Sequence, residues 1–367
     1  MNCAARQLSN GSQSLWRSGL VLILALLAIV LGQHIPVPGF NTAALAQQSL
    51  VYNNQWSARY SIFSLGMMPI VAVLVYVEIA KLLMPWLAKE SVSPFTGTAW
   101  ISWLSKTLIL LISATQGYAV WMALLSMGLV PSTTAAMVGA ILSFMAATAV
   151  LIWLASIIRF PGLNNGLWWL LAMFSLTELP NALRRLLALF HSEMMWLGVW
   201  VFCGVVLILA ALALMAVLMV ARKVLAISSR TDISTELLMS ALMWPPLLAS
   251  IVGGHVLGLC FWLSPHAIAG RPWLIDAITL VATIVLVPLF GRRYLAQVAA
   301  KQGMETKGSA GIALWWLVGL QVQICAGFWL LDLMFAAPIL PTGATFIVFV
   351  CVVLALCRGL SVNRAKA

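Results

Sequence analysis

The chain has 367 residues, of which 63% are hydrophobic and only 8% are charged, and its mean hydropathy is +1.05. This composition excludes a soluble globular protein and is typical of a helical membrane protein with many spans. In a soluble protein the net charge of +11 would suggest nucleic-acid binding. Here the tendency of Lys and Arg to collect in cytoplasmic loops explains the charge better, so we expect no direct contact with nucleic acid.

Ten apolar runs are long enough, or nearly so, to cross a bilayer, which takes roughly 20 helical residues. In chain order they lie near residues 15–32, 62–84, 107–129, 136–158, 166–183, 198–221, 238–263, 274–291, 311–336 and 342–359. The predicted fold class is therefore all-α, a polytopic membrane protein with ten transmembrane helices.

The distribution of basic residues predicts the orientation of these spans. With the N-terminus in the cytoplasm, all but four of the 20 Lys and Arg residues fall in cytoplasmic segments, and the C-terminus is cytoplasmic too. The four exceptions are Arg59, Arg184, Arg185 and Arg271.

Ten spans divide into two sets of five at a linker predicted at 184–197. The N-terminal half (1–183) and the C-terminal half (198–367) then have opposite orientations, because each contains an odd number of spans. Inverted halves of this kind place a pathway at their interface.

The segment from Ser61 to Lys81 is the least ordinary of the spans. It is an apolar helix whose start carries a break at Gly66 and Pro69, and Glu78 lies near its far end. Proline lacks an N–H, and broken helices persist in membranes where protein or water satisfies the freed backbone. A simple anchor needs neither the break nor the carboxylate, whereas a helix that lines a path through the bilayer could use both.

The sequence contains no pattern typical of catalysis or metal binding. Its six Cys lie mostly within apolar runs without CxxC spacing, and its four His are scattered. Nucleotide-binding and hydrolase motifs do not occur in a suitable context. We therefore predict no catalytic residues, no metal site and no cofactor.

Each half of the chain contains motifs of its own. They are IPVPG (35–39), SIFSLGMMP (61–69), the stretch 151–180 with GLNNG at 162–166, MSALMWPPLLAS (239–250) and PTGATFIVFV (341–350). Together with Lys89-Glu90 and Gln116 they resemble the SecY family, the protein-conducting channels of bacteria. The resemblance touches most of the chain, and the motifs of the first half are the more specific. It implies a channel that moves proteins across or into the bacterial inner membrane and has no catalysis of its own.

The chain departs from the family pattern mainly in its cytoplasmic loops. The loop between the sixth and seventh spans is reduced to ARKVLAISSRTDISTE, and the next cytoplasmic loop lacks the PGxRPG tip that engages the SecA motor and the ribosome. Val30 stands where the first span usually carries an arginine. The sequence therefore resembles a divergent, shortened SecY-like paralogue.

By resemblance, an apolar pore ring maps to Val71, Val75, Leu171, Ser175, Leu247 and Val348. Narrow aliphatic rings exclude ions by dewetting. Val71 and Val75 are four residues apart and share one helix face, whereas Ser175 breaks the apolar pattern. The alternative is that these residues only pack in the bundle or face lipid.

The resemblance also assigns residues 49–60 to a plug-like segment. Its polar side chains are Tyr52, Asn53, Asn54, Gln55 and Arg59. They suit a hydrated vestibule, and an ordinary external loop fits the sequence equally well.

A lateral gate is implied between the second and third spans and the seventh and eighth, with Glu78 and Gln116 in its polar patch. A carboxylate in a span costs a few kcal/mol unless it is paired or hydrated. Lys81 offers a partner three residues away, so the alternative to a gating role is a local pair or extension of both side chains toward the cytoplasm. Our hypothesis is that the Glu78 charge stiffens gate opening and makes it pH dependent.

Arg222, Lys223, Arg292 and Arg293 belong by resemblance to loops that dock a ribosome or a SecA-like motor. The alternative is that they set topology and contact anionic lipid, at about 1 kcal/mol per charge. The other partners implied are secretory or membrane protein clients and a SecE-like small subunit. Two other functions stay open, a ten-span small-solute transporter and a non-conducting scaffold derived from a channel.

Overall fold

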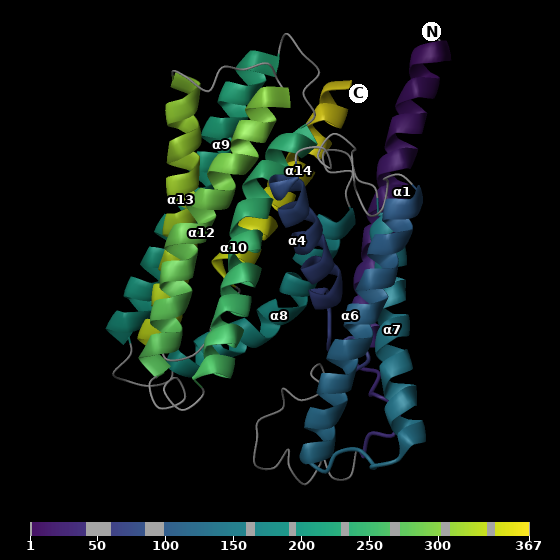
Figure 1. Cartoon of the computed structure of the whole chain (residues 1–367). Coiled ribbons are helices and arrows are strands. Elements are labelled where there is room, and N and C mark those ends of the chain that lie inside the picture. The colour runs from purple at the N-terminus through teal and green to yellow at the C-terminus, as the bar shows by residue number, and fades with distance from the viewer. Residues whose placement is uncertain are drawn as a thin grey trace. The chain divides into compact units, whose positions relative to one another are not determined.

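The computed structural model describes residues 2–41, 60–84, 99–158, 166–190, 196–228, 235–264, 272–301, 309–335 and 342–366. In these ranges the chain forms ten long α-helices (Figure 1). They are α1 (Asn2–Gly32), α4 (Met68–Leu83), α6 (Ala99–Ser126), α7 (Thr134–Ile157), α8 (Gly166–Phe190), α9 (Trp196–Ser228), α10 (Thr235–Leu263), α12 (Pro272–Lys301), α13 (Ser309–Phe335) and α14 (Gly343–Lys366). Each predicted apolar run overlaps one of these helices, so the all-α prediction is confirmed.

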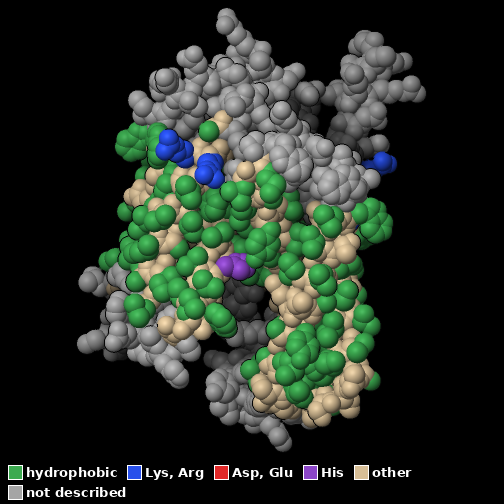
Figure 2. Space-filling view, in the orientation of Figure 1, with side chains coloured by type: hydrophobic (Ala, Val, Ile, Leu, Met, Phe, Trp, Pro, Cys, Tyr) green, Lys and Arg blue, Asp and Glu red, His purple; other side chains and the backbone are tan. Residues whose placement is uncertain are grey.

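The outer faces of the helices are apolar. Hydrophobic side chains cover much of the described surface in Figure 2. Large aromatic side chains are exposed too, such as Trp103 of α6 at 74% and Trp262 of α10 at 78%. Extended apolar surface of this kind is unfavourable in water and suits contact with lipid. Within the described residues, four helical stretches are both long and apolar enough to cross a bilayer: Ser102–Ser126, Thr134–Ile157, Leu242–Leu263 and Ala277–Tyr294.

The chain divides into two compact units, residues 1–177 with 360–367, and residues 178–359. The boundary falls inside α8, which continues to Phe190. The linker predicted at 184–197 therefore begins within a helix. The sequence suggested an earlier end because Arg184 and Arg185 close the apolar run, but charged residues are compatible with a helix that extends beyond the apolar layer.

In the first unit, α6 and α7 lie side by side (Figure 1). The buried hydroxyl groups of Ser113 and Thr148 are 2.8 Å apart, and Thr148 also donates to the Phe144 carbonyl oxygen at 2.9 Å. Gly117 lets α6 approach the Phe144 ring, since a Cβ there would lie 2.8 Å from it. Small residues and satisfied hydroxyl groups are typical of helix contacts in membranes, where apolar burial alone does not drive association.

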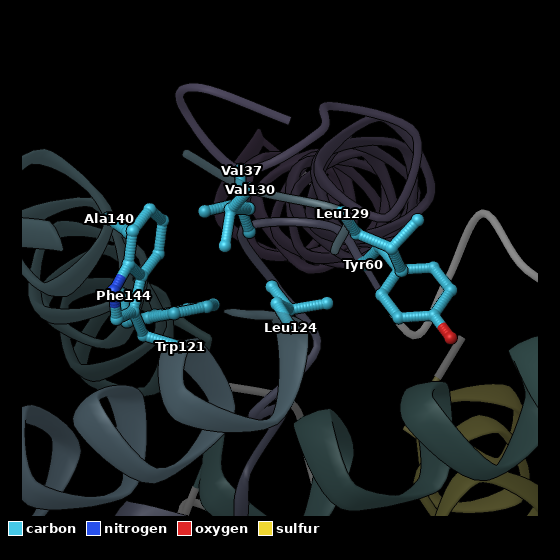
Figure 3. Close-up of a cluster of buried hydrophobic side chains, with 8 residues drawn as sticks. All are labelled: Val37, Tyr60, Trp121, Leu124, Leu129, Val130, Ala140 and Phe144. Carbon is cyan, nitrogen blue, oxygen red and sulfur yellow. The ribbon is translucent and has the colours of Figure 1, made fainter. Parts of the chain in front are cut away.

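A cluster of buried side chains joins the turn between α6 and α7 to the segments that flank the α1–α4 connection. Figure 3 shows its members, which are Val37, Tyr60, Trp121, Leu124, Leu129, Val130, Ala140 and Phe144. The Phe40 and Tyr60 rings stack with centroids 5.4 Å apart, and Val37 N–H donates to the Tyr60 carbonyl at 3.1 Å. Asn41 N–H donates to the Leu129 carbonyl at 2.9 Å.

In the second unit, α10 and α12 lie side by side, and α13 packs against α12 and α9. Gly343 brings the start of α14 against the α13 backbone, because a Cβ there would lie 2.6 Å from Cα of Cys325. Helix α10 carries Pro245 and Pro246 in its interior, and α12 carries Pro288.

Candidate functional site

The start of α4 explains the predicted break in this span. Gly66 adopts a φ of 51°, in the left-handed region that favours glycine, and its N–H donates to the Phe63 carbonyl at 2.8 Å. Residues 62–67 form turns, and α4 begins at Met68 with Pro69 in its first turn. A proline at that position loses no intrahelical hydrogen bond. The break is therefore the beginning of the helix, and the preceding turns replace the first part of the predicted span.

Val71 and Val75 lie one helical turn apart on α4 and are 4% and 0% exposed. On α8, which belongs to the same unit up to Thr177, Leu171 is buried and Ser175 is half-buried. The Ser175 hydroxyl donates to the Leu171 carbonyl at 3.0 Å. This bond within its own helix explains how a serine is accommodated in an apolar run.

Two residues assigned to the ring lie in the second unit. Leu247 of α10 and Val348 of α14 are both buried. Four of the six residues therefore belong to the first unit and two to the second, and the ring that would join them stays a prediction.

The polar residues assigned to the gate lie on α4 and α6, which pack against each other. Lys81 Nζ and Glu78 Oε1 form an ion pair at 2.6 Å, with side chains 15% and 13% exposed. The predicted local pair is confirmed. On α6, Gln116 Oε1 is buried and accepts no hydrogen bond from any described residue.

The plug-like residues Tyr52, Asn53, Asn54, Gln55 and Arg59 lie outside the described residues. The structure does describe both flanks of this connection. Antiparallel pairing of Pro36 with Ser61, and the Ile62 N–H bond to the Ile35 carbonyl at 3.0 Å, hold them together. The connection thus leaves and returns at one place on the first unit.

The basic residues assigned to docking lie on two helices of the second unit. Arg222 and Lys223 fall in α9, where their side chains are outside the described part. Arg292 and Arg293 of α12 are exposed, and Arg292 Cζ lies 5.9 Å from the centroid of the Trp315 ring of α13. This distance allows a cation–π contact, which sequence reasoning missed. The available signal was that Arg292 and Trp315 lie at the predicted cytoplasmic ends of two consecutive spans.

No three His, Cys, Asp or Glu side chains of the described ranges come together as a metal site requires. Sequence reasoning also missed Gln33, which follows α1 and whose Nε2 donates to Thr177 Oγ1 of α8 at 3.1 Å. A second glutamine that it missed, Gln321 of α13, is 3% exposed.

SecY subunits of two bacteria match part of the chain. It is 30% identical over 176 residues to the protein translocase subunit SecY of Pseudomonas aeruginosa, an alignment that covers 44% of this chain and 40% of that protein. It is 27% identical over 176 residues to the corresponding subunit of Haemophilus influenzae, with the same coverage. The matched segment thus spans well under two thirds of these relatives.

Solved channel structures match nearly the whole chain. A SecY structure, described by its plug domain that stabilises the closed channel, gives a TM-score of 0.52 at 13% identity and covers 95% of this chain and 90% of that one. Sec61 in the canine ribosome–channel complex gives a TM-score of 0.50 at 13% identity, with 95% and 91% covered. This likeness shows a shared fold, that of a multi-pass membrane protein. The SecY family model matches residues 61–361, most of the chain and parts of both units, and the protein therefore belongs to the SecY family.

Proposed function

We propose that this protein is a protein-conducting channel that moves polypeptides across, or inserts them into, the bacterial inner membrane. The observation that carries the proposal is the family match over residues 61–361, which includes every residue assigned to the pore ring. The chain has no catalytic chemistry of its own in this proposal. Energy comes from a partner, or from the transfer of apolar client segments into lipid.

The burial of the paired valines on α4 supports a closed pore. Val71 and Val75 present aliphatic side chains from one helix face, and a constriction of such side chains dewets and blocks ions while it can fit around a passing chain. Glu78 and Lys81 follow on the same helix as a local ion pair, which lowers the cost of burying their charges in the span.

The topology in this proposal has both termini in the cytoplasm, which follows from the distribution of Lys and Arg. A SecE-like small subunit and secretory or membrane protein clients are the expected partners. Arg222, Lys223, Arg292 and Arg293 are then cytoplasmic and available to a SecA-like motor, a ribosome or anionic lipid. The shortened loops favour lipid contact and insertion of apolar clients, which supply part of their own driving force.

Site-specific photo-crosslinking from Val71 in the intact cell tests the proposal. We expect crosslinks to nascent or secretory polypeptides, which become stronger when export is stalled. Leu111 is the matched control, because it is 60% exposed on α6 and is expected to crosslink to lipid or neighbouring membrane proteins. Crosslinks from Val71 only to this chain's own segments, even under stalled export, would favour a scaffold or a small-solute transporter.

The gating role of Glu78 stays a prediction, and Glu78→Gln tests it. If the carboxylate charge stiffens the gate, transport by the wild type varies with pH and the variant loses most of that variation while retaining activity. The measurement is client translocation into vesicles over a pH series. Identical pH profiles for the two proteins would contradict the hypothesis.

A further inference from the structure

Helix α10 has two adjacent backbone positions that cannot complete its hydrogen-bond ladder. Pro245 and Pro246 lie in its interior, and each lacks the N–H that would bond to the carbonyl four residues earlier. The two carbonyl groups left without an intrahelical donor are those of Ala241 and Leu242. In the apolar layer of a membrane water cannot easily replace that donor, so a neighbouring helix must supply it.

Gln321 of α13 supplies the donor for one of them. Its Nε2 donates to the Leu242 carbonyl oxygen at 2.9 Å. Gln321 is 3% exposed and Leu242 is 2% exposed, so the bond is shielded from solvent. The side chain of one helix thus replaces the backbone donor that Pro246 removes from another.

The other end of the Gln321 amide is unsatisfied. Its Oε1 is buried and has no hydrogen-bond partner in the part of the chain that the structure describes. Gln321 lines a cavity of about 20 Å³, which is room for roughly one water molecule. The other lining residues are apolar and come from α9, α10, α13 and α14: Ala213, Ala216, Leu242, Leu317, Leu320, Ile324, Ile347 and Val350.

The contact between α10 and α13 can change without leaving the Leu242 carbonyl unsatisfied. The hydrogen bond fixes α10 against α13 at the Leu242 carbonyl, one turn before Pro246, and the small cavity beside it leaves unfilled space at this contact. One water in the cavity could take the place of the Gln321 amide on the Leu242 carbonyl when the bond breaks.

We propose that Gln321 is a positioning residue that latches α10 at Pro246 and that release of this latch accompanies channel opening. The latch itself rests on the geometry of the second unit. Its effect on opening rests on the proposed function, in which α10, the helix of the MSALMWPPLLAS motif, lines the lateral gate.

A double-mutant cycle tests the latch. Gln321→Leu leaves the Leu242 carbonyl without a donor, and we expect the midpoint of thermal unfolding to fall by roughly 2–4 °C. Pro246→Ala restores the backbone N–H, so Gln321→Leu in that background should cost under about 1 °C. Pro245→Ala is the matched control, since it restores a donor for Ala241 and should leave the cost of Gln321→Leu undiminished. An equal cost in all three backgrounds would overturn the latch.

The effect on opening has a separate measurement, the yield of client crosslinks from Val71. We expect Gln321→Leu to raise the yield at least about twofold, with or without Pro246→Ala, because the backbone bond that Pro246→Ala restores lies within α10 and does not tie it to α13. Coupling in the thermal cycle with an unchanged crosslink yield would overturn the role in opening. If Val71 gives no client crosslinks in any variant, the proposed function fails, and the thermal cycle still decides whether Gln321 holds α10.

Discussion

Replacing Gly166 with alanine will destabilise the first unit. Gly166 is the first residue of α8 and is buried. A Cβ built on it would collide with the carbonyl oxygen of Ala155 and lie 2.9 Å from that of Ile158, both at the end of α7. These atoms belong to the backbone, so no side-chain rotation relieves the collision, and α8 must move away from α7.

The expected cost is about 1–3 kcal/mol, the range for overpacking a tightly packed interior, and the variant should also accumulate less in the membrane. The measurement is thermal unfolding of purified protein in detergent. Gly19→Ala is the control, because a Cβ at Gly19 of α1 would meet nothing within 4 Å. It should be neutral or slightly stabilising, since alanine is favoured over glycine in a helix by up to about 1 kcal/mol. Similar losses in both variants would show that the contact between α7 and α8 is not the cause.

The contact at Gly166 also gives a physical reason for one of the motifs that carry the resemblance. GLNNG at 162–166 ends at the residue that approaches the α7 backbone. From the sequence alone the motif could be matched but not explained, because the neighbouring carbonyl groups belong to residues eight and eleven positions earlier, at the end of α7.

Much of the fold could be predicted because each membrane span is encoded by one continuous apolar stretch of the sequence. Each apolar run became a helix, and the Glu78–Lys81 pair followed from a spacing of three residues on one helix. Helix ends were harder to predict. Residues 62–67 are apolar enough for a span, yet Gly66 and Pro69 place them in turns, and α8 passes through Arg184 and Arg185.

Contacts between distant helices could not be predicted in the same way. Pro246 predicts that the Leu242 carbonyl lacks its backbone donor. Nothing near Pro246 in the sequence identifies Gln321, which is 79 residues from Leu242, as the replacement. The contact between Arg292 and Trp315 likewise depends on how α12 and α13 pack. The pore ring stays a prediction, because its six assigned residues come from four helices of both units and no local pattern could encode a contact among them.

Substituting asparagine for Val71 or Val75 will make the membrane leak ions. In the proposed channel both side chains belong to the constriction, and an amide there would hold water where the aliphatic group excludes it. The apolar burial of one valine side chain is worth about 1.5 kcal/mol. If the barrier to hydration of the constriction falls by this amount, the ion leak rises by about tenfold. The measurement is ion conductance of purified protein in planar bilayers without a client.

Val73→Asn separates a leak through the pore from general damage to the fold. Val73 is 2% exposed, close to Val71 and Val75, but it lies on the opposite face of α4. All three variants bury an amide and should lose similar stability, about 1–3 kcal/mol. Only the substitutions at Val71 and Val75 should raise conductance, because only that face is assigned to the pore. If Val73→Asn leaks as much as the other two, α4 does not line a pore through this face, and the burial of Val71 and Val75 reflects packing alone.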